Sequence, residues 1–155
     1  MANPKIRPAV AKDAVALSNL ILENAHELLL PYYNEEQWIA FSKFYAPDEM
    51  KKKIAEQRIF CAEVDEQIAG TIALDKNLLV GFYTNIHFLN KGIGKMLMEY
   101  IETLTVKEGI TELELTASPL AVTFYDKMGW TRIKVNTYYY FGVGFEETLM
   151  IKNLI

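Results

Sequence analysis

The chain has 155 residues, of which 51% are hydrophobic and 23% are charged, and its net charge is −4. This composition predicts one globular domain spanning residues 1–155, because a chain of roughly 150 residues buries about 68–70% of its unfolded surface without support from a metal or a disulfide. The acidic charge balance makes nucleic acid a poor partner, no apolar run is long enough for a membrane span, and the single cysteine, Cys61, favours the reducing cytoplasm.

The first half of the chain predicts one strand, three helices and then three strands. A strand at residues 6–9 precedes a helix at residues 13–29, whose apolar residues recur at helical spacing. Asn34 and Gln37 have the spacing of a capping box that opens a second helix, and Pro47 opens a third. Three strands that are expected to pair as an antiparallel meander follow at residues 59–64, 67–74 and 78–85.

The second half begins with a predicted helix at residues 93–108, which ends at Gly109. A strand, a helix and two final strands follow at residues 112–116, 119–128, 132–140 and 147–152. Gly142-Val143-Gly144 is interpreted as a turn or a bulge between the last two strands. The order of elements predicts an α+β fold: a mixed, largely antiparallel central sheet of about seven strands, with helices on both faces.

The most informative segment runs from a strand through a glycine loop into a helix. Gly92 and Gly94 lack a Cβ, so the backbone there can approach a ligand closely, and the free N–H groups at the start of a helix bind anions. Lys91 and Lys95 lie at the positive end of this helix, which is unfavourable unless an anion binds. Phosphate is the expected ligand; a simple tight turn with two solvated lysines is the alternative.

Two well-known phosphate-binding motifs are excluded by position. A Walker loop requires glycine at position 89 and serine or threonine after the lysine, where this chain has Leu89 and Met96. A dinucleotide-binding fingerprint requires a third glycine where Leu97 stands. The antiparallel meander before the loop also disfavours a parallel nucleotide-binding fold.

Two blocks of the sequence resemble the GCN5-related N-acetyltransferase (GNAT) superfamily. The loop Leu89-Asn90-Lys91-Gly92-Ile93-Gly94 is similar to the Gln/Arg-x-x-Gly-x-Gly/Ala loop after the fourth strand, with Leu89 in place of the usual Gln or Arg. The segment Ala121-Val122-Thr123-Phe124-Tyr125-Asp126-Lys127-Met128-Gly129-Trp130 is similar to Ala-x-x-(Phe/Leu)-Tyr-x-x-x-Gly-Phe after the fifth strand. Together with the opening Ile6-Arg7-Pro8-Ala9, the resemblance extends over nearly the whole chain.

The resemblance implies an enzyme that moves an acetyl group from acetyl-CoA to an amine by direct attack in a ternary complex, without a metal. Main-chain groups of Leu89, Asn90, Lys91, Gly92, Ile93, Gly94 and Lys95 would bind the pyrophosphate. Phe82, Tyr83 and Thr84 of the fourth strand would pair with the pantetheine arm, beside Ser118, where many relatives carry Asn. Tyr125 would be the general acid that protonates the departing CoA thiolate; a purely packing role for its ring is the alternative.

Several features leave alternatives open. The general base is one of His26, Asp75, His87 and Glu114, or a water molecule. The aromatic residues Tyr32, Tyr33, Trp38, Phe41, Phe44 and Tyr45 either border the acceptor site or form ordinary helix core. Residues 138–141 serve sheet packing or an oligomer surface, and a homodimer is the default expectation. The alternative function is a non-catalytic CoA-binding sensor or regulatory module; in either case the acceptor class stays undetermined.

Overall fold

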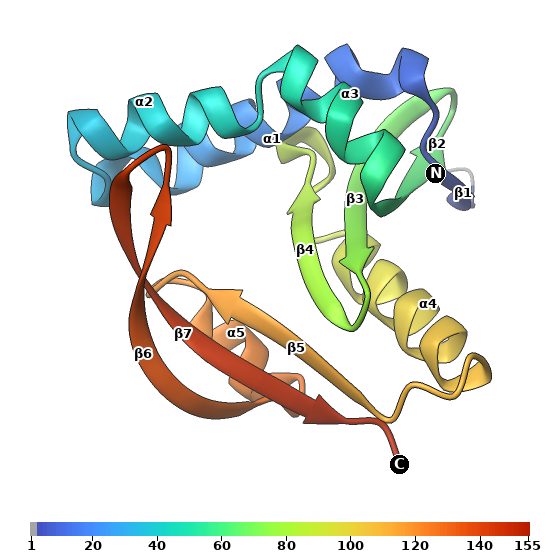
Figure 1. The fold of residues 1–155 in the computed structure, drawn as a ribbon. Helices are drawn as coiled ribbons and strands as arrows, with labels where there is room; N and C mark the ends of the chain where they lie inside the picture. Colours follow the sequence, from blue (N-terminus) through green and yellow to red (C-terminus); the bar gives the residue numbers. More distant parts are fainter. Residues whose placement is uncertain (1–2) are drawn as a thin grey trace.

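The computed structural model describes residues 3–155 and contains seven strands and five α-helices (Figure 1). The strands are β1 (Lys5–Pro8), β2 (Arg58–Val64), β3 (Gln67–Asp75), β4 (Leu78–Thr84), β5 (Glu112–Ala117), β6 (Thr131–Tyr140) and β7 (Val143–Asn153). The helices are α1 (Ala14–Leu28), α2 (Glu35–Phe44), α3 (Pro47–Glu56), α4 (Ile93–Lys107) and α5 (Val122–Lys127). Short 3-10 turns precede α1, α2 and the glycine loop at Ala11–Asp13, Leu30–Tyr32 and Ile86–Phe88.

The strands form one sheet in the order β1-β2-β3-β4-β5-β7-β6. Every neighbouring pair is antiparallel except β4 and β5, which are parallel and share a single residue pair, Leu78 with Glu114. Beyond that pair the two strands diverge, so the sheet opens into a V whose arms are β1–β4 and β5–β7 (Figure 1). The predicted α+β class, with a mixed and largely antiparallel sheet of seven strands, is confirmed.

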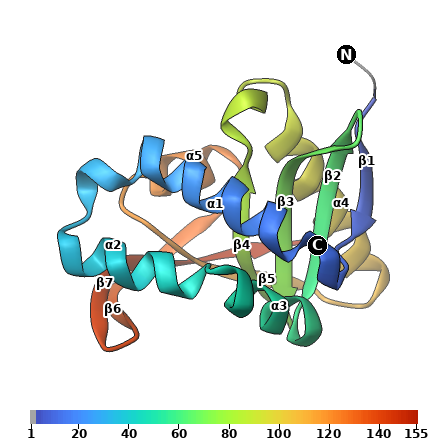
Figure 2. The ribbon, with the colours of Figure 1, turned by 90° about the horizontal axis from the view of Figure 1, so that it is seen from above.

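Helices cover both faces of the sheet. Helices α1, α2 and α3 bury residues such as Leu17, Ile21 and Met50 in one core, and Figure 2 shows α1 crossing over β3 and β4. Helices α4 and α5 bury Leu97 and Tyr125 in a second core on the opposite face. None of the helices within residues 3–155 is long and apolar enough to cross a lipid bilayer.

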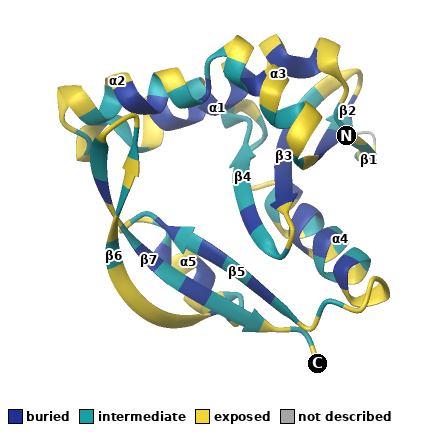
Figure 3. Cartoon of the chain, in the orientation of Figure 1, coloured by how far each residue is buried: buried dark blue, intermediate teal, exposed yellow. Residues whose placement is uncertain are grey.

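The last two strands form a longer hairpin than the sequence indicates. Strand β7 begins at Val143 rather than at residue 147, because a two-residue turn with positive φ angles, Phe141 (51°) and Gly142 (76°), joins it directly to β6. Gly144 therefore lies inside the ladder opposite Tyr139 and is not part of the turn. Strand β6 is one of the two edge strands of the sheet and is largely exposed (Figure 3).

Gly70 of β3 allows the start of α4 to approach the sheet. A Cβ at this position would lie 2.7 Å from Cγ2 of Ile93 and 3.0 Å from Cδ1 of Leu97. Ile93 is buried and β-branched, so its side chain cannot easily rotate away. We expect Gly70→Ala to lower the free energy of unfolding by about 1–3 kcal/mol, as measured by urea denaturation.

The matched control is the same exchange at Gly94, in the first turn of α4. Its added Cβ would lie 3.4 Å from the Phe82 ring, which is an ordinary contact. The unfolding free energy of Gly94→Ala should therefore stay within about 1 kcal/mol of the wild type. Equal stabilities of Gly70→Ala and the wild type would contradict the tight packing of α4 on β3.

Candidate active site

A cavity of about 780 Å³ lies where β4 and β5 diverge. One wall is β4 with the loop that leads into α4, and the facing wall is the end of β5 with α5. Aromatic residues from the α2 segment and from β6 and β7 close the remaining side. The cavity thus brings together the two sequence blocks that carry the resemblance, which are separated by about thirty residues along the chain.

The glycine loop presents a row of free main-chain N–H groups. Gly92 is the N-cap of α4 and has a φ of 79°, and Asn90 also has a positive φ of 60°. Within residues 3–155, no N–H from 89 to 95 donates a hydrogen bond; the first that does is that of Met96, to the Gly92 carbonyl at 3.1 Å. Such a row at a helix N-terminus, with no acidic residue in the first turn, has the geometry and charge that favour binding of an anion.

Strand β4 offers its unpaired edge to the cavity. Its pairing with β3 is interrupted by a register shift at Gly81, whose φ is 54°, and beyond Leu78 it has no partner on the β5 side. The side-chain amide of Asn24 on α1 donates to the Thr84 carbonyl at 2.7 Å and so fixes the end of the strand. A polar chain rich in amides can hydrogen-bond to such an edge.

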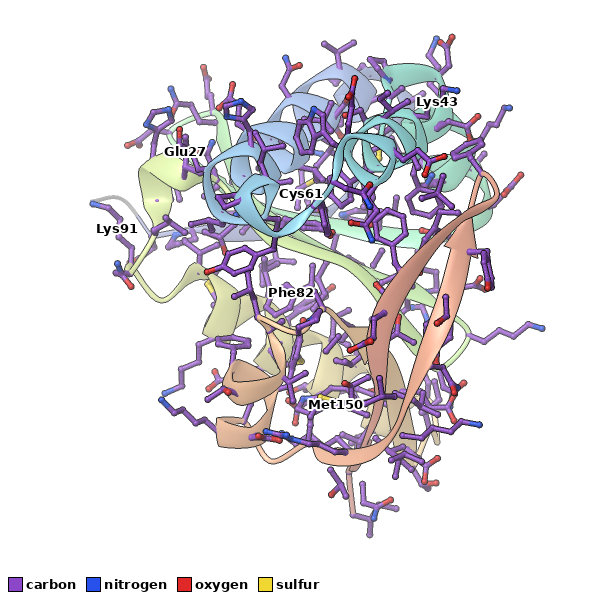
Figure 4. The ribbon with its side chains drawn as sticks, turned by 90° about the vertical axis from the view of Figure 1, so that its left-hand side faces the viewer. Glu27, Lys43, Cys61, Phe82, Lys91 and Met150 are labelled. Atoms are coloured by element: carbon purple, nitrogen blue, oxygen red, sulfur yellow. The ribbon has the colours of Figure 1, made fainter. Side chains whose placement is uncertain are left out.

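The first turn of α4 lies beside β4 at Gly94. Its Cα lies beside the ring of Phe82, which points to the α5 face of β4. Phe82 lies near the middle of the molecule, between the helical layer and the lower sheet arm, whereas Lys91 lies at its outer margin (Figure 4). The unpaired edge of β4 therefore lies farther inside the molecule than the free N–H groups of the loop (Figure 4).

Tyr125 of α5 reaches the cavity from the opposite wall. Its ring packs against Phe82, Phe124 and Trp130, with ring centroids 6.4, 5.2 and 5.9 Å away. Its hydroxyl has no hydrogen-bond partner among the described residues and is not enclosed by them, so it opens onto the cavity. Burial raises the pKa of Tyr125 above its usual value of 10, which keeps the hydroxyl protonated at neutral pH.

The structure brings nearly all of the predicted site residues to this cavity. Those that line it are Phe82, Tyr83, Thr84, Leu89, Asn90, Gly92, Ile93, Gly94, Lys95, Ser118 and Tyr125. Lys91 is exposed and does not line it. The four residues considered as general bases lie elsewhere: none of His26, Asp75, His87 and Glu114 lines the cavity.

Of the aromatic residues between Tyr32 and Tyr45 that were considered for the acceptor site, only some line the cavity. Tyr33, Phe41, Phe44 and Tyr45 line the cavity, whereas Trp38 stacks on Phe41 outside it. Burial raises the pKa of Tyr45 to about 12, and it raises the pKa of the neighbouring Tyr83 well above 10. These hydroxyls therefore stay neutral at physiological pH.

Sequence reasoning missed Glu147, which lines the cavity from β7. Its Oε1 accepts hydrogen bonds from the Tyr140 hydroxyl at 2.9 Å and the Thr116 hydroxyl at 3.1 Å. Burial raises the pKa of Glu147 above its usual 4.5, although these two hydrogen bonds oppose the rise. The available signal was a carboxylate on the same strand face as Phe145 and Leu149, and it already lay at the start of the strand predicted at residues 147–152.

Comparisons with known proteins agree with this architecture. The sequence from residue 29 to residue 149 matches the Acetyltransferase (GNAT) domain family, whereas a search of curated proteins finds no match. A GCN5-related N-acetyltransferase structure from Rhodopseudomonas palustris has a TM-score of 0.89 at 22% identity, covering 99% of this chain and 97% of that one. The PaiA N-acetyltransferase of Thermoplasma acidophilum, solved with coenzyme A, has a TM-score of 0.79 at 22% identity, covering 98% and 99%.

A probable acetyltransferase from Staphylococcus epidermidis has a TM-score of 0.76 at 15% identity, covering 97% of this chain and 98% of that one. At these identities the structures establish a common fold, and the family match covers well over half of the sequence. The chain belongs to the GNAT acetyltransferase family and is an N-acetyltransferase.

Proposed function

We propose that the protein transfers the acetyl group of acetyl-CoA directly to a primary amine, with both substrates bound at the same time. The observation that carries this proposal is the continuity of one cavity, which runs from the free N–H groups of residues 89–95, along the unpaired edge of β4, to the Tyr125 hydroxyl. This path has a place for each part of the coenzyme.

The loop and the strand have separate roles in the proposed complex. The N–H groups of residues 89–95 bind the pyrophosphate, with Lys91 and Lys95 adding positive charge nearby. The edge of β4 around Phe82, Tyr83 and Thr84 pairs with the amides of the pantetheine arm, and Ser118 borders the arm from the β5 side. One free N–H of β4 stabilises the oxyanion that forms on the thioester carbonyl, a type of contact worth roughly 3–4 kcal/mol in other enzymes.

Tyr125 completes the reaction as the general acid. A neutral amine attacks the thioester carbonyl carbon, the C–S bond breaks, and the Tyr125 hydroxyl protonates the departing thiolate. The raised pKa of Tyr125 suits this role because the group is fully protonated at neutral pH. Its position on the wall opposite the β4 edge would place the sulfur between the strand and the hydroxyl.

The first test is binding and turnover of the wild-type protein. Isothermal titration with acetyl-CoA should show saturable binding, and the melting temperature should rise when acetyl-CoA is present. Release of free CoA thiol, followed with a thiol reagent, should then depend on an added amine. Binding without turnover over a broad panel of amines would indicate a CoA sensor instead, and no binding at millimolar acetyl-CoA would refute both functions.

A further inference from the structure

We propose that Glu147 binds the ammonium group of the acceptor and takes up its proton, and that the acceptor is a small primary monoamine with an apolar or aromatic body. The inference rests on the proposed acetyl transfer and names its acceptor class. It stands on two features of the structure: the place of Glu147 between two cavities, and the lack of a cationic partner for its carboxylate within residues 3–155.

Glu147 lies where two cavities meet. The second cavity has a volume of about 300 Å³. The residues that border both cavities are Leu29, Tyr33, Ser118, Leu120, Phe145 and Glu147. An acceptor in the second cavity can therefore reach the carboxylate from the side away from β4, while acetyl-CoA occupies the β4 edge. A ternary complex requires two such approaches to one reaction centre.

One carboxylate oxygen of Glu147 accepts two hydrogen bonds, and the other oxygen accepts none within residues 3–155. Both hydrogen bonds, from Tyr140 and Thr116, go to Oε1. Within the described part of the chain, Oε2 accepts no hydrogen bond, is not enclosed, and no Lys, Arg or His forms an ion pair with the carboxylate. A partly buried carboxylate without a countercharge is unfavourable, so an incoming alkylammonium ion would supply the missing cation.

The surroundings of this carboxylate define the body of the acceptor. Among residues 3–155, Glu147 is the one acidic residue that lines the larger cavity. Around it the lining is aromatic: Tyr33, Phe44, Tyr45, Tyr140 and Phe145, with the Tyr140 ring 5.1 Å from Phe44 and 5.3 Å from Phe145. A carboxylate within aromatic rings binds one ammonium group by charge and by cation–π contact, and the rings receive an apolar body.

The second cavity favours a cation without a carboxylate of its own. Among its lining residues are Glu147 and the exposed Glu146, and none is Lys, Arg or His. An amino acid would bring a carboxylate that finds no basic side chain there. A polyamine would place additional positive charges against a mainly apolar lining, which is unfavourable because those charges would lose their hydration.

The proton balance uses both Glu147 and Tyr125. The bound ammonium gives one proton to the Glu147 carboxylate, and the neutral amine nitrogen forms a bond to the thioester carbonyl carbon. When the C–S bond breaks, the thiolate takes the proton of the Tyr125 hydroxyl. The nitrogen of the new amide gives up its second proton, which restores the Tyr125 hydroxyl, and Glu147 releases its proton to water.

The test compares Glu147→Gln with Glu114→Gln, using 2-phenylethylamine as the acceptor. Glutamine keeps an oxygen that can accept from Tyr140 and Thr116, so the melting temperature should not fall. We expect Glu147→Gln to lower kcat/KM for the amine about 10²–10⁴-fold with an unchanged Kd for acetyl-CoA. Glu114 lies on the same face of the sheet and lines neither cavity, so Glu114→Gln should retain wild-type kinetics. Wild-type turnover by a folded Glu147→Gln variant would overturn the assignment.

A pH profile separates a base from a residue that only shapes the site. The wild-type kcat/KM should fall as the pH is lowered through the raised pKa of Glu147, because a protonated carboxyl group cannot accept the ammonium proton. The other titratable side chains that line the larger cavity are Lys53, Lys95, Tyr33, Tyr45, Tyr83, Tyr125 and Tyr140, and the second cavity adds Tyr32 and Glu146. Burial raises the pKa values of the five tyrosines of the larger cavity, so they do not titrate in this range. An acidic limb that persists unchanged in Glu147→Gln would contradict the base role.

The acceptor class is tested with three amines at equal concentration. Turnover of 2-phenylethylamine should exceed that of spermidine and of phenylalanine at least tenfold in kcat/KM. Preference for spermidine or phenylalanine would overturn the monoamine class while leaving acetyl transfer intact. Failure to bind acetyl-CoA would instead refute the proposed function itself, so the two failures are distinguishable.

Discussion

Replacement of Tyr125 by phenylalanine is expected to lower kcat about 10²–10⁴-fold, the usual contribution of a positioned proton donor. The ring contacts with Phe82, Phe124 and Trp130 remain in this variant, so only the hydroxyl group, the proposed proton donor, is removed. The thiolate must then leave without a proton or take one from water. Steady-state kinetics with saturating amine measure the loss, and the KM for acetyl-CoA should stay within about twofold of the wild type.

The matched control is Tyr139→Phe. The side chain of Tyr139 is 71% exposed on the edge strand β6, so removal of its hydroxyl should leave the kinetics unchanged. A Tyr125→Phe variant with kcat within twofold of the wild type would contradict the acid role. The leaving group would then be protonated by solvent, and the ring of Tyr125 would serve only to pack α5 against β4.

Charge reversal at the glycine loop is the second prediction with a large effect. We expect the double variant Lys91→Glu/Lys95→Glu to raise the Kd for acetyl-CoA by about 10²-fold. Each reversal removes an attraction to the phosphates and adds a repulsion. Each of these two interactions is worth about 1 kcal/mol at contact distance in water, and salt screens part of both. Isothermal titration at two salt concentrations measures both the loss and its electrostatic origin.

The same double variant should be at least as stable as the wild type. The first turn of α4 has no acidic residue, and a carboxylate at the N-terminus of a helix stabilises it by about 0.3–1 kcal/mol. The matched control is Lys51→Glu/Lys52→Glu on the surface of α3, which makes the same change in net charge. Binding that weakens equally in both double variants would reflect net charge alone and would contradict a phosphate site at the loop.

Opposite effects of the double variant on binding and on stability would indicate an anion-binding site at the loop. Seven successive main-chain N–H groups and two lysines lie together at one helix start, and the chain provides no internal group to satisfy them within residues 3–155. A loop shaped only for a turn would place an acidic or capping side chain there. In contrast, α2 begins with such a cap: the Asn34 side chain accepts from the N–H of Gln37 at 2.8 Å.

Local sequence signals were sufficient for most of the elements. The helix predicted at residues 93–108 is α4, and the capping box of Asn34 and Gln37 opens α2. The glycine loop could also be interpreted from the sequence because its chemistry lies in consecutive residues. Positive φ angles at Gly92 and free N–H groups follow from glycine and from the start of a helix, and neither depends on distant parts of the chain.

The last strand was predicted too short because its turn was misplaced. Three residues at 142–144 were interpreted as one irregular segment, whereas the hairpin turn is made by Phe141 and Gly142. A bulky aromatic residue at a positive φ is not indicated by turn propensity. Its conformation results from the twist that the long β6–β7 ladder imposes on the turn. Moving the start of β7 to Val143 places Glu147, which was the first residue of the predicted strand, in the interior of the observed one.

By itself, the sequence determined the order of the elements and located the glycine loop and Tyr125 within two short motifs, because each of these features depends on residues that are close together along the chain. Only the tertiary structure decided where β4 and β5 separate and which carboxylate lies in the space between them. Glu147, Tyr140 and Thr116 come from three strands, and their contact depends on the register of pairing across the sheet. The raised pKa of Glu147 likewise comes from burial by distant segments, a property that no local pattern contains.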